Sequence, residues 1–130
     1  MSIARDLATF LTGVSYADLP PQSLEHAMML ISSTLASAAG GSTIASSSII
    51  RNLARDRGGR PEASIWFDSG SKLPVGDAAQ VNAVMSDAAA SDDSDLRNIV
   101  HAGTTLVSTS LAVAEQTGAS GQNVLAAIVL

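Results

Sequence analysis

The sequence predicts a mainly α-helical fold, on three observations. Apolar residues make up 46% of the chain and aromatic residues only 3%, so Ala, Leu, Ile, Val and Met must form the core. Such side chains suit closely packed helices better than an aromatic-rich β-sandwich. Apolar positions recur at the helical period of 3.6 residues, and glycines and prolines separate these segments. We therefore expect five or six helices and one short β-hairpin in a single domain, residues 1–130.

The first helix follows Ser2, whose hydroxyl can cap it, and ends at Gly13. Its apolar side chains lie at one-turn spacing: Ile3, Leu7, Phe10 and Leu11.

Two further helices are expected in the first half of the chain. One runs from about Gln22 to Ala39, after Pro21, because a proline is well accommodated at a helix start. The pair Gly40-Gly41 is predicted to end it. The next covers Ile44 to Arg57 and stops at a second glycine pair.

After these helices the spacing of apolar residues changes from the helical period to a strand-like pattern. Residues 63–67 are β-prone, residues 68–71 are typical of a turn, and Lys72-Leu73-Pro74 follow. This pattern predicts a hairpin near Ile65–Leu73, with Trp66 as a core anchor.

Three helices are expected in the second half. Asp77 is predicted to cap the first, Ala78 to about Ala89. The next runs from about Thr104 to Gln116, and Ser120 starts the last. Residues 124–130 are apolar almost all round, and such a helix is expected to be buried on every face. We therefore interpret the chain as the N-terminal piece of a longer helical domain, and expect the uncapped apolar end to drive association.

Composition and charge exclude several classes of function. The absence of cysteine rules out disulfides, thiolate metal sites and cysteine nucleophiles. A net charge of −5 argues against nucleic acid as a partner, because phosphate binding needs a basic face. Apolar runs are too short to span a membrane, and the N-terminus lacks the layout of a signal peptide. We expect a cytoplasmic protein.

The best candidate for chemistry is the segment from Asp87 to His101. It holds four acids, Ser94 and one of only two histidines; the acids are Asp87, Asp92, Asp93 and Asp95, and the histidine is His101. A histidine beside a carboxylate can act as a general base. The alternative is a solvated acidic loop in which His101 caps the next helix. A calcium loop is disfavoured, because the central glycine and the distal glutamate are missing.

Other chemical candidates have simpler interpretations. His26 lies within a predicted helix and is expected to be a structural or surface residue. The arginines between residues 51 and 60 indicate a solvated helix face, because no aromatic side chains are interleaved with them. Ser108 and Ser110 lack the surroundings of a nucleophilic serine.

Several stretches, in this order and spacing, resemble the start of MmgE/PrpD family enzymes: residues 14–21, 59–66, 72–74, 77–82 and 112–121. The resemblance implies a large helical domain opened by these residues. The family includes 2-methylcitrate dehydratases, cis-aconitate decarboxylases and iminodisuccinate epimerases. It therefore implies a small di- or tricarboxylate substrate, no metal or organic cofactor, and a homodimer.

The resemblance also implies site residues. The family run Asp-x-Asp-Asp-Thr, followed by a histidine, corresponds here to residues 90–94 and His101. Asp92, Asp93 and His101 match, and Ser94 keeps the hydroxyl of the threonine. Ala90 replaces the first aspartate, which favours an epimerase-type member over a methylcitrate dehydratase.

The implied reaction is proton abstraction beside a carboxylate, followed by elimination, decarboxylation or reprotonation. His101 is predicted to act as acid/base, oriented by Asp92 or Asp93, with Ser94 binding a substrate carboxylate. Gly103 and Thr104 would let the backbone at a helix N-terminus approach the substrate. Residues 1–130 alone are expected to be inactive, because Lys72 is the only lysine. The alternative is a non-catalytic helical module, or subunit, that packs on a partner.

Overall fold

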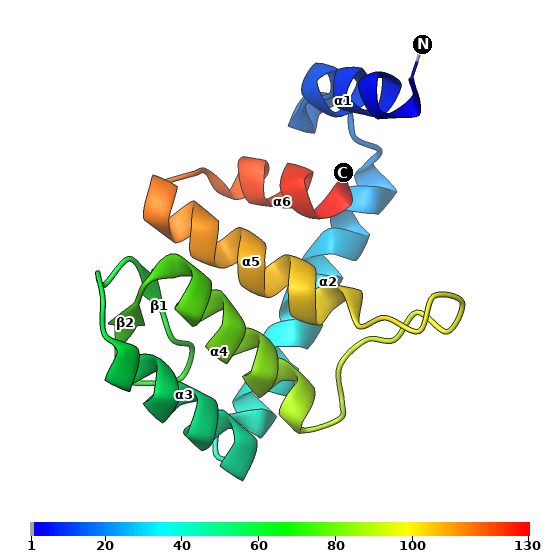
Figure 1. The fold of residues 1–130 in the computed structure, drawn as a ribbon. Coiled ribbons are helices and arrows are strands. Elements are labelled where there is room, and N and C mark those ends of the chain that lie inside the picture. The colour runs from blue at the N-terminus through cyan, green and yellow to red at the C-terminus, as the bar shows by residue number, and fades with distance from the viewer. Residues whose placement is uncertain (1) are drawn as a thin grey trace.

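The computed structural model describes residues 2–130, which form six α-helices, one 3-10 helix and a two-stranded sheet (Figure 1). This confirms the predicted mainly α fold with a short hairpin. The elements in chain order are α1 (Ile3–Gly13), η1 (Tyr16–Asp18), α2 (Pro21–Gly41), α3 (Ala45–Arg57), β1 (Ala63–Ser64), β2 (Lys72–Leu73), α4 (Val75–Ala88), α5 (Ala102–Thr117) and α6 (Gly121–Val129).

Two of the predicted helix caps are confirmed. The Ser2 hydroxyl accepts a hydrogen bond from the Arg5 amide at 3.4 Å. The Ser120 hydroxyl accepts one from the Asn123 amide at 3.3 Å. Each satisfies an amide that has no partner within its own helix.

The predicted role of Asp77 as a helix cap is wrong. Helix α4 begins at Val75, and Pro74 occupies the capping position. Asp77 lies within the first turn, where a carboxylate interacts favourably with the positive end of the helix dipole. Its carboxylate also pairs with Arg57 at 2.9 Å, which ties α4 to α3.

The glycine pair at the end of α2 has a different role from the one predicted. Gly40 and Gly41 belong to the last turn of the helix, and Gly41 is buried. A Cβ atom at Gly41 would overlap with the carbonyl oxygen of Met85 in α4. Gly41 therefore allows two helices to approach closely, which a side chain would prevent.

The core consists of two clusters of buried apolar residues. The first joins α2, α3, α4 and the hairpin around Val81 and Met85. The second joins α2, α5 and α6 around Val107, Val124 and Ile128. Trp66 packs against both clusters while it remains partly exposed. Small side chains in these clusters let the helix axes come close together.

Helix α6 is buried on one face rather than on every face. Val124 and Ile128 are buried, whereas Ala127 and Leu130 are exposed in this structure. The expectation of burial all round is therefore not met within residues 2–130.

The strands pair antiparallel, with Ala63 opposite Leu73. Asn82 of α4 fixes the hairpin, because its side chain accepts a hydrogen bond from the Trp66 amide and donates one to the Ser64 carbonyl. The buried amide of Asn82 thereby satisfies backbone groups that the short ladder leaves free.

Helix length and hydropathy bear on membrane insertion. Among residues 2–130 no single helix is long and apolar enough to cross a membrane. Helices α2 and α3 reach the required length and hydropathy only when taken together, and they are bent by 93° at their junction.

Candidate active site

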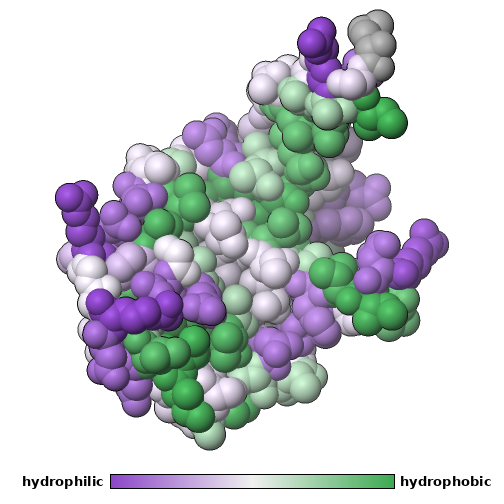
Figure 2. All heavy atoms as spheres, in the orientation of Figure 1, coloured by the Kyte–Doolittle hydropathy of each residue, from purple (hydrophilic) through white to green (hydrophobic). Residues whose placement is uncertain are grey.

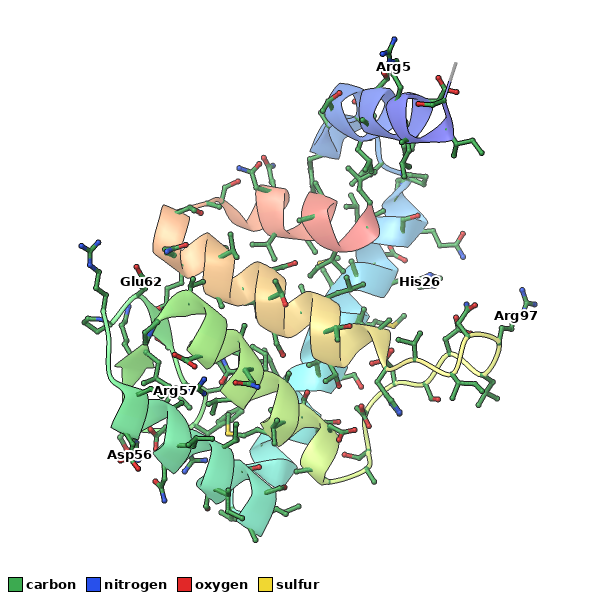
Figure 3. All side chains as sticks on the ribbon, viewed as in Figure 1. Arg5, His26, Asp56, Arg57, Glu62 and Arg97 are labelled. Carbon is green, nitrogen blue, oxygen red and sulfur yellow. The ribbon has the colours of Figure 1, made fainter. Side chains whose placement is uncertain are left out.

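The loop between α4 and α5 carries the predicted catalytic residues Asp92, Asp93 and His101 and projects from the helices (Figure 1). Its outer part is a small turn in which the Asp95 amide donates to the Val100 carbonyl at 2.9 Å. Hydrogen bonds from the Asn98 side chain and the Arg97 amide hold the pKa of the Asp95 carboxyl below its usual range. Figure 3 shows Arg97 at the tip, pointing away from the helices. Asp95 therefore shapes the loop.

The inner part of the loop brings Asp92 and His101 together. The Asp92 side chain is 3% exposed, and its Oδ2 lies 3.0 Å from Nδ1 of His101. The Thr104 hydroxyl donates a hydrogen bond to the same oxygen at 2.9 Å. Burial of a carboxylate is tolerated where hydrogen bonds compensate for the water it loses, as they do here.

The tautomer of His101 follows from the partners of its ring. Nδ1 lies 2.8 Å from the backbone carbonyl of Asp93 as well as 3.0 Å from Asp92. A carbonyl and a carboxylate can only accept, so Nδ1 carries the proton and Nε2 is the basic nitrogen. The side chain is 47% exposed, so a solute can reach the ring. This arrangement suits a general base.

Asp93 is engaged differently from Asp92. Its Oδ1 accepts a hydrogen bond from the Gly103 amide at 2.9 Å, in the first turn of α5. His101 occupies the capping position of α5 but makes no capping bond with its own side chain. Asp93 therefore caps α5 from ten residues away. It contacts the imidazole through its carbonyl rather than its carboxylate.

The predicted substrate-binding residues are only partly brought together. Thr104 is buried and bonded to Asp92, and Gly103 is buried with its amide bonded to Asp93. Ser94 is exposed on the loop. Contact of these three residues with a substrate stays a prediction.

Asp87, at the end of α4, was part of the candidate segment but was not among the predicted site residues. Ligand atoms of Asp87, Asp92 and His101 lie within 4.8 Å of one another. Such a trio could also hold a cation, although exposed acids often gather without one. The sequence shows that Asp87 lies close to Asp92 along the chain. Whether the side chain of Asp87 reaches Asp92 and His101 depends on how α4 ends.

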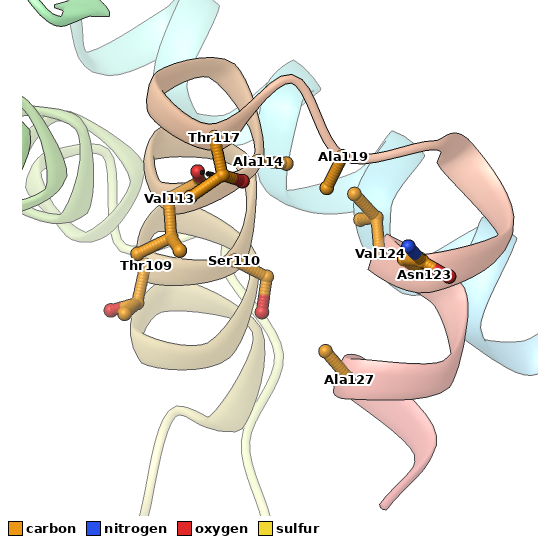
Figure 4. A pocket seen from close by; sticks show the side chains of 9 residues that line it. All are labelled: Thr109, Ser110, Val113, Ala114, Thr117, Ala119, Asn123, Val124 and Ala127. Atoms are coloured by element: carbon orange, nitrogen blue, oxygen red, sulfur yellow. Dashed lines mark hydrogen bonds between the residues drawn. The ribbon is translucent and has the colours of Figure 1, made fainter. Parts of the chain in front are cut away.

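The other candidates lie apart from this cluster. Arg51 and Arg55 form ion pairs with Asp68 in the hairpin turn. These contacts within the fold explain two of the clustered arginines. A hollow of about 310 Å³ lies between α5 and α6 (Figure 4). Its lining holds no acid or base: Thr109, Ser110, Val113, Ala114, Thr117, Ala119, Asn123, Val124 and Ala127. It therefore lacks groups for proton transfer.

Fold and site together define a class of protein, a helical domain that presents a histidine–carboxylate pair suited to proton transfer. A family model described as MmgE/PrpD N-terminal domain matches residues 5–130. The chain belongs to the MmgE/PrpD family and contains its N-terminal domain. No curated protein and no solved structure matches the sequence.

Proposed function

We propose that this protein is a lyase or isomerase that removes a proton from a carbon beside a carboxylate of a small di- or tricarboxylic acid. The observation that carries the proposal is the pairing of Asp92 with Nδ1 of His101, which leaves Nε2 as the base on a half-exposed ring. Membership of the MmgE/PrpD family supports this choice of chemistry.

In the proposed step, Nε2 of His101 takes up the proton and the ring becomes an imidazolium ion. Asp92 stabilises that cation, because its buried carboxylate lies 3.0 Å from Nδ1. The substrate is left with a carbanion, which then loses a leaving group or regains a proton. Positioned donors and cations lower the energy of such a charge.

The epimerase-type reaction is the form we favour. Ala90 stands where the resemblance places an acid of dehydrating and decarboxylating members. Epimerisation needs only removal and return of a proton, so it makes the least demand on that position. We propose no cofactor for this step and a homodimer as the working form.

The proposal is tested by solvent exchange. The complete gene product is incubated in D₂O with iminodisuccinate, cis-aconitate or 2-methylcitrate, and deuterium in the recovered acids is measured by mass spectrometry. His101→Ala should lower exchange or turnover by about 10²–10⁴-fold, the usual loss for a general base. His26→Ala is the matched control, because His26 is exposed on α2 (Figure 3). Equal activity of the His101→Ala protein and the control would refute the assignment.

The second candidate function is a non-catalytic module that packs on a partner. The observation in its favour is α1, which contains no buried residue and exposes Ile3, Leu7 and Phe10. Exposed apolar patches often mark interaction surfaces. Absence of exchange with every acid tested, together with a stable complex through α1, would support this alternative.

A further inference from the structure

A chain of buried hydroxyl groups extends inward from the Asp92–His101 pair. Thr104 of α5 donates to Asp92 at 2.9 Å, and the Ser86 hydroxyl of α4 lies 3.1 Å from the Thr104 hydroxyl. Ser86 is fully buried and Thr104 is 9% exposed. The chain therefore links the core between two helices to the candidate base.

The direction of these hydrogen bonds follows from counting protons. Ser86 has one hydroxyl proton and two acceptors in reach, the Ala83 carbonyl at 2.9 Å and Thr104 at 3.1 Å. Thr104 gives its own proton to the charged Asp92, because charge-assisted hydrogen bonds are the stronger ones. Its oxygen is then free to accept from Ser86, which shares its one proton between Thr104 and the Ala83 carbonyl.

Resting on the function proposed above, we propose that Ser86 is a positioning residue for that reaction. Its hydroxyl holds Thr104 against Asp92. Asp92, together with the Asp93 carbonyl 2.8 Å from the same nitrogen, keeps the proton on Nδ1 of His101. Loss of the Ser86 hydroxyl leaves Thr104 free to rotate away, so the carboxylate loses a fixed donor and turns more freely. The Asp93 carbonyl alone then favours the Nδ1–H tautomer less strongly. The imidazole samples both tautomers, and Nε2 is the available base for only part of the time.

The two histidines make this measurable without a substrate. Long-range ¹H–¹⁵N NMR spectra of the protein distinguish the two tautomers of each ring, and His26 serves as an internal reference, because it is exposed on α2. In the wild-type protein His101 should be a single Nδ1–H tautomer. Ser86→Ala should give a mixture at His101 and leave the His26 signals unchanged.

Two further variants complete the test. Ser108→Ala is the matched control, because it removes a buried serine hydroxyl of α5 that has no partner among the described residues. It should keep the single tautomer. Thr104→Val should give the mixture that Ser86→Ala gives, whereas Thr104→Ser retains the hydroxyl and the single tautomer.

Several results would overturn the inference. These are a mixed tautomer in the wild-type protein, a single tautomer in folded Ser86→Ala, or an equal change in Ser108→Ala. Should Ser86→Ala fail to fold, the Thr104 pair decides. If wild-type His101 is a single tautomer but the protein turns over none of the acids, the proposed function alone is refuted. If the wild-type protein is active but His101 is a mixture of tautomers, this inference alone is refuted. In active protein, Ser86→Ala should lower kcat several-fold with KM unchanged.

Discussion

Asp92 and Asp93 are adjacent in the chain, yet the structure uses their carboxylates for different purposes. Asp92 is buried against His101 and Thr104, whereas Asp93 caps α5 through the Gly103 amide. The sequence predicted that one of the two would orient the imidazole. At the scale of residues, the carboxylate of Asp92 lies 3.0 Å from Nδ1 of His101, whereas that of Asp93 bonds to the helix from which Thr104 projects. An orienting role for Asp92 stays a prediction.

Gly103 should not accept a side chain. A Cβ atom there would overlap with Asp93 and lie 2.6 Å from the Thr34 hydroxyl and 2.8 Å from Leu30. We expect Gly103→Ala to lower the free energy of unfolding by about 1–3 kcal/mol, as overpacked cores do. Urea unfolding measures the change.

Gly76→Ala in α4 is the control for that experiment, because nothing lies within 4 Å of the added atom. It should be neutral or stabilising, since alanine favours helices over glycine. Equal stability of the two variants would show that the loop yields to a side chain at Gly103.

At the scale of elements, Glu115 holds the hairpin against α5. Its carboxylate accepts hydrogen bonds from the Ser64 amide at 2.6 Å and the Ser64 hydroxyl at 2.7 Å, and Lys72 lies 2.6 Å away. Desolvation by partial burial raises the pKa of Glu115, but the hydrogen bonds from Lys72 and Ser64 and the charge of Lys72 outweigh it and lower the pKa overall. One side chain thus connects α5 with both strands.

This contact should make stability depend on pH. Because the pKa of Glu115 is lower in the folded state, its contribution is present above the unfolded value and is lost as the pH falls through the folded one. Glu115→Gln should cost about 1 kcal/mol at pH 7, the value of a typical hydrogen bond. The difference in Tm from wild type should shrink between pH 5 and about pH 3.

The control for Glu115 is Glu25→Gln, which changes an exposed glutamate on α2. It should alter Tm little at any pH. A difference between Glu115→Gln and wild type that stays constant down to pH 3 would contradict a role for the charged carboxylate.

At the scale of the whole molecule, hydrophobic surface gathers on α1 and on the projecting loop (Figure 2). Ile3 is 86% exposed, and Leu7 and Phe10 are each more than half exposed. An aromatic side chain such as Phe10 buries on the order of 200 Å² when it is fully covered. Helix α1 therefore offers a substantial part of the roughly 800 Å² that each partner contributes to a standard interface.

We expect the protein to self-associate through this face of α1. Sedimentation at increasing concentration should show dimers or larger species. Phe10→Glu should weaken them, because it would bury a charge in the contact. Thr9→Glu, on an exposed neighbouring position of α1, should have little effect. A wild-type protein that stays monomeric at the highest concentration would contradict the expectation.

The sequence alone predicted the features that depend on near neighbours. Helix periodicity, the caps at Ser2 and Ser120 and the hairpin turn each involve residues a few positions apart, so their physics is local. The segment containing Asp92 and His101 was also identified, because acids and a histidine gather there in the chain.

Tertiary structure decided the rest, because helix packing sets which distant groups meet. Gly41 ends a helix in the sequence, yet it is needed for contact with α4. The sequence predicts Asp77 as the N-cap of α4, but Pro74 occupies the N-cap position and Asp77 forms an ion pair with Arg57. Ser86 has no chemical signal of its own in the sequence. It contacts Thr104, 18 residues away, only because α4 and α5 bring the two hydroxyl groups together.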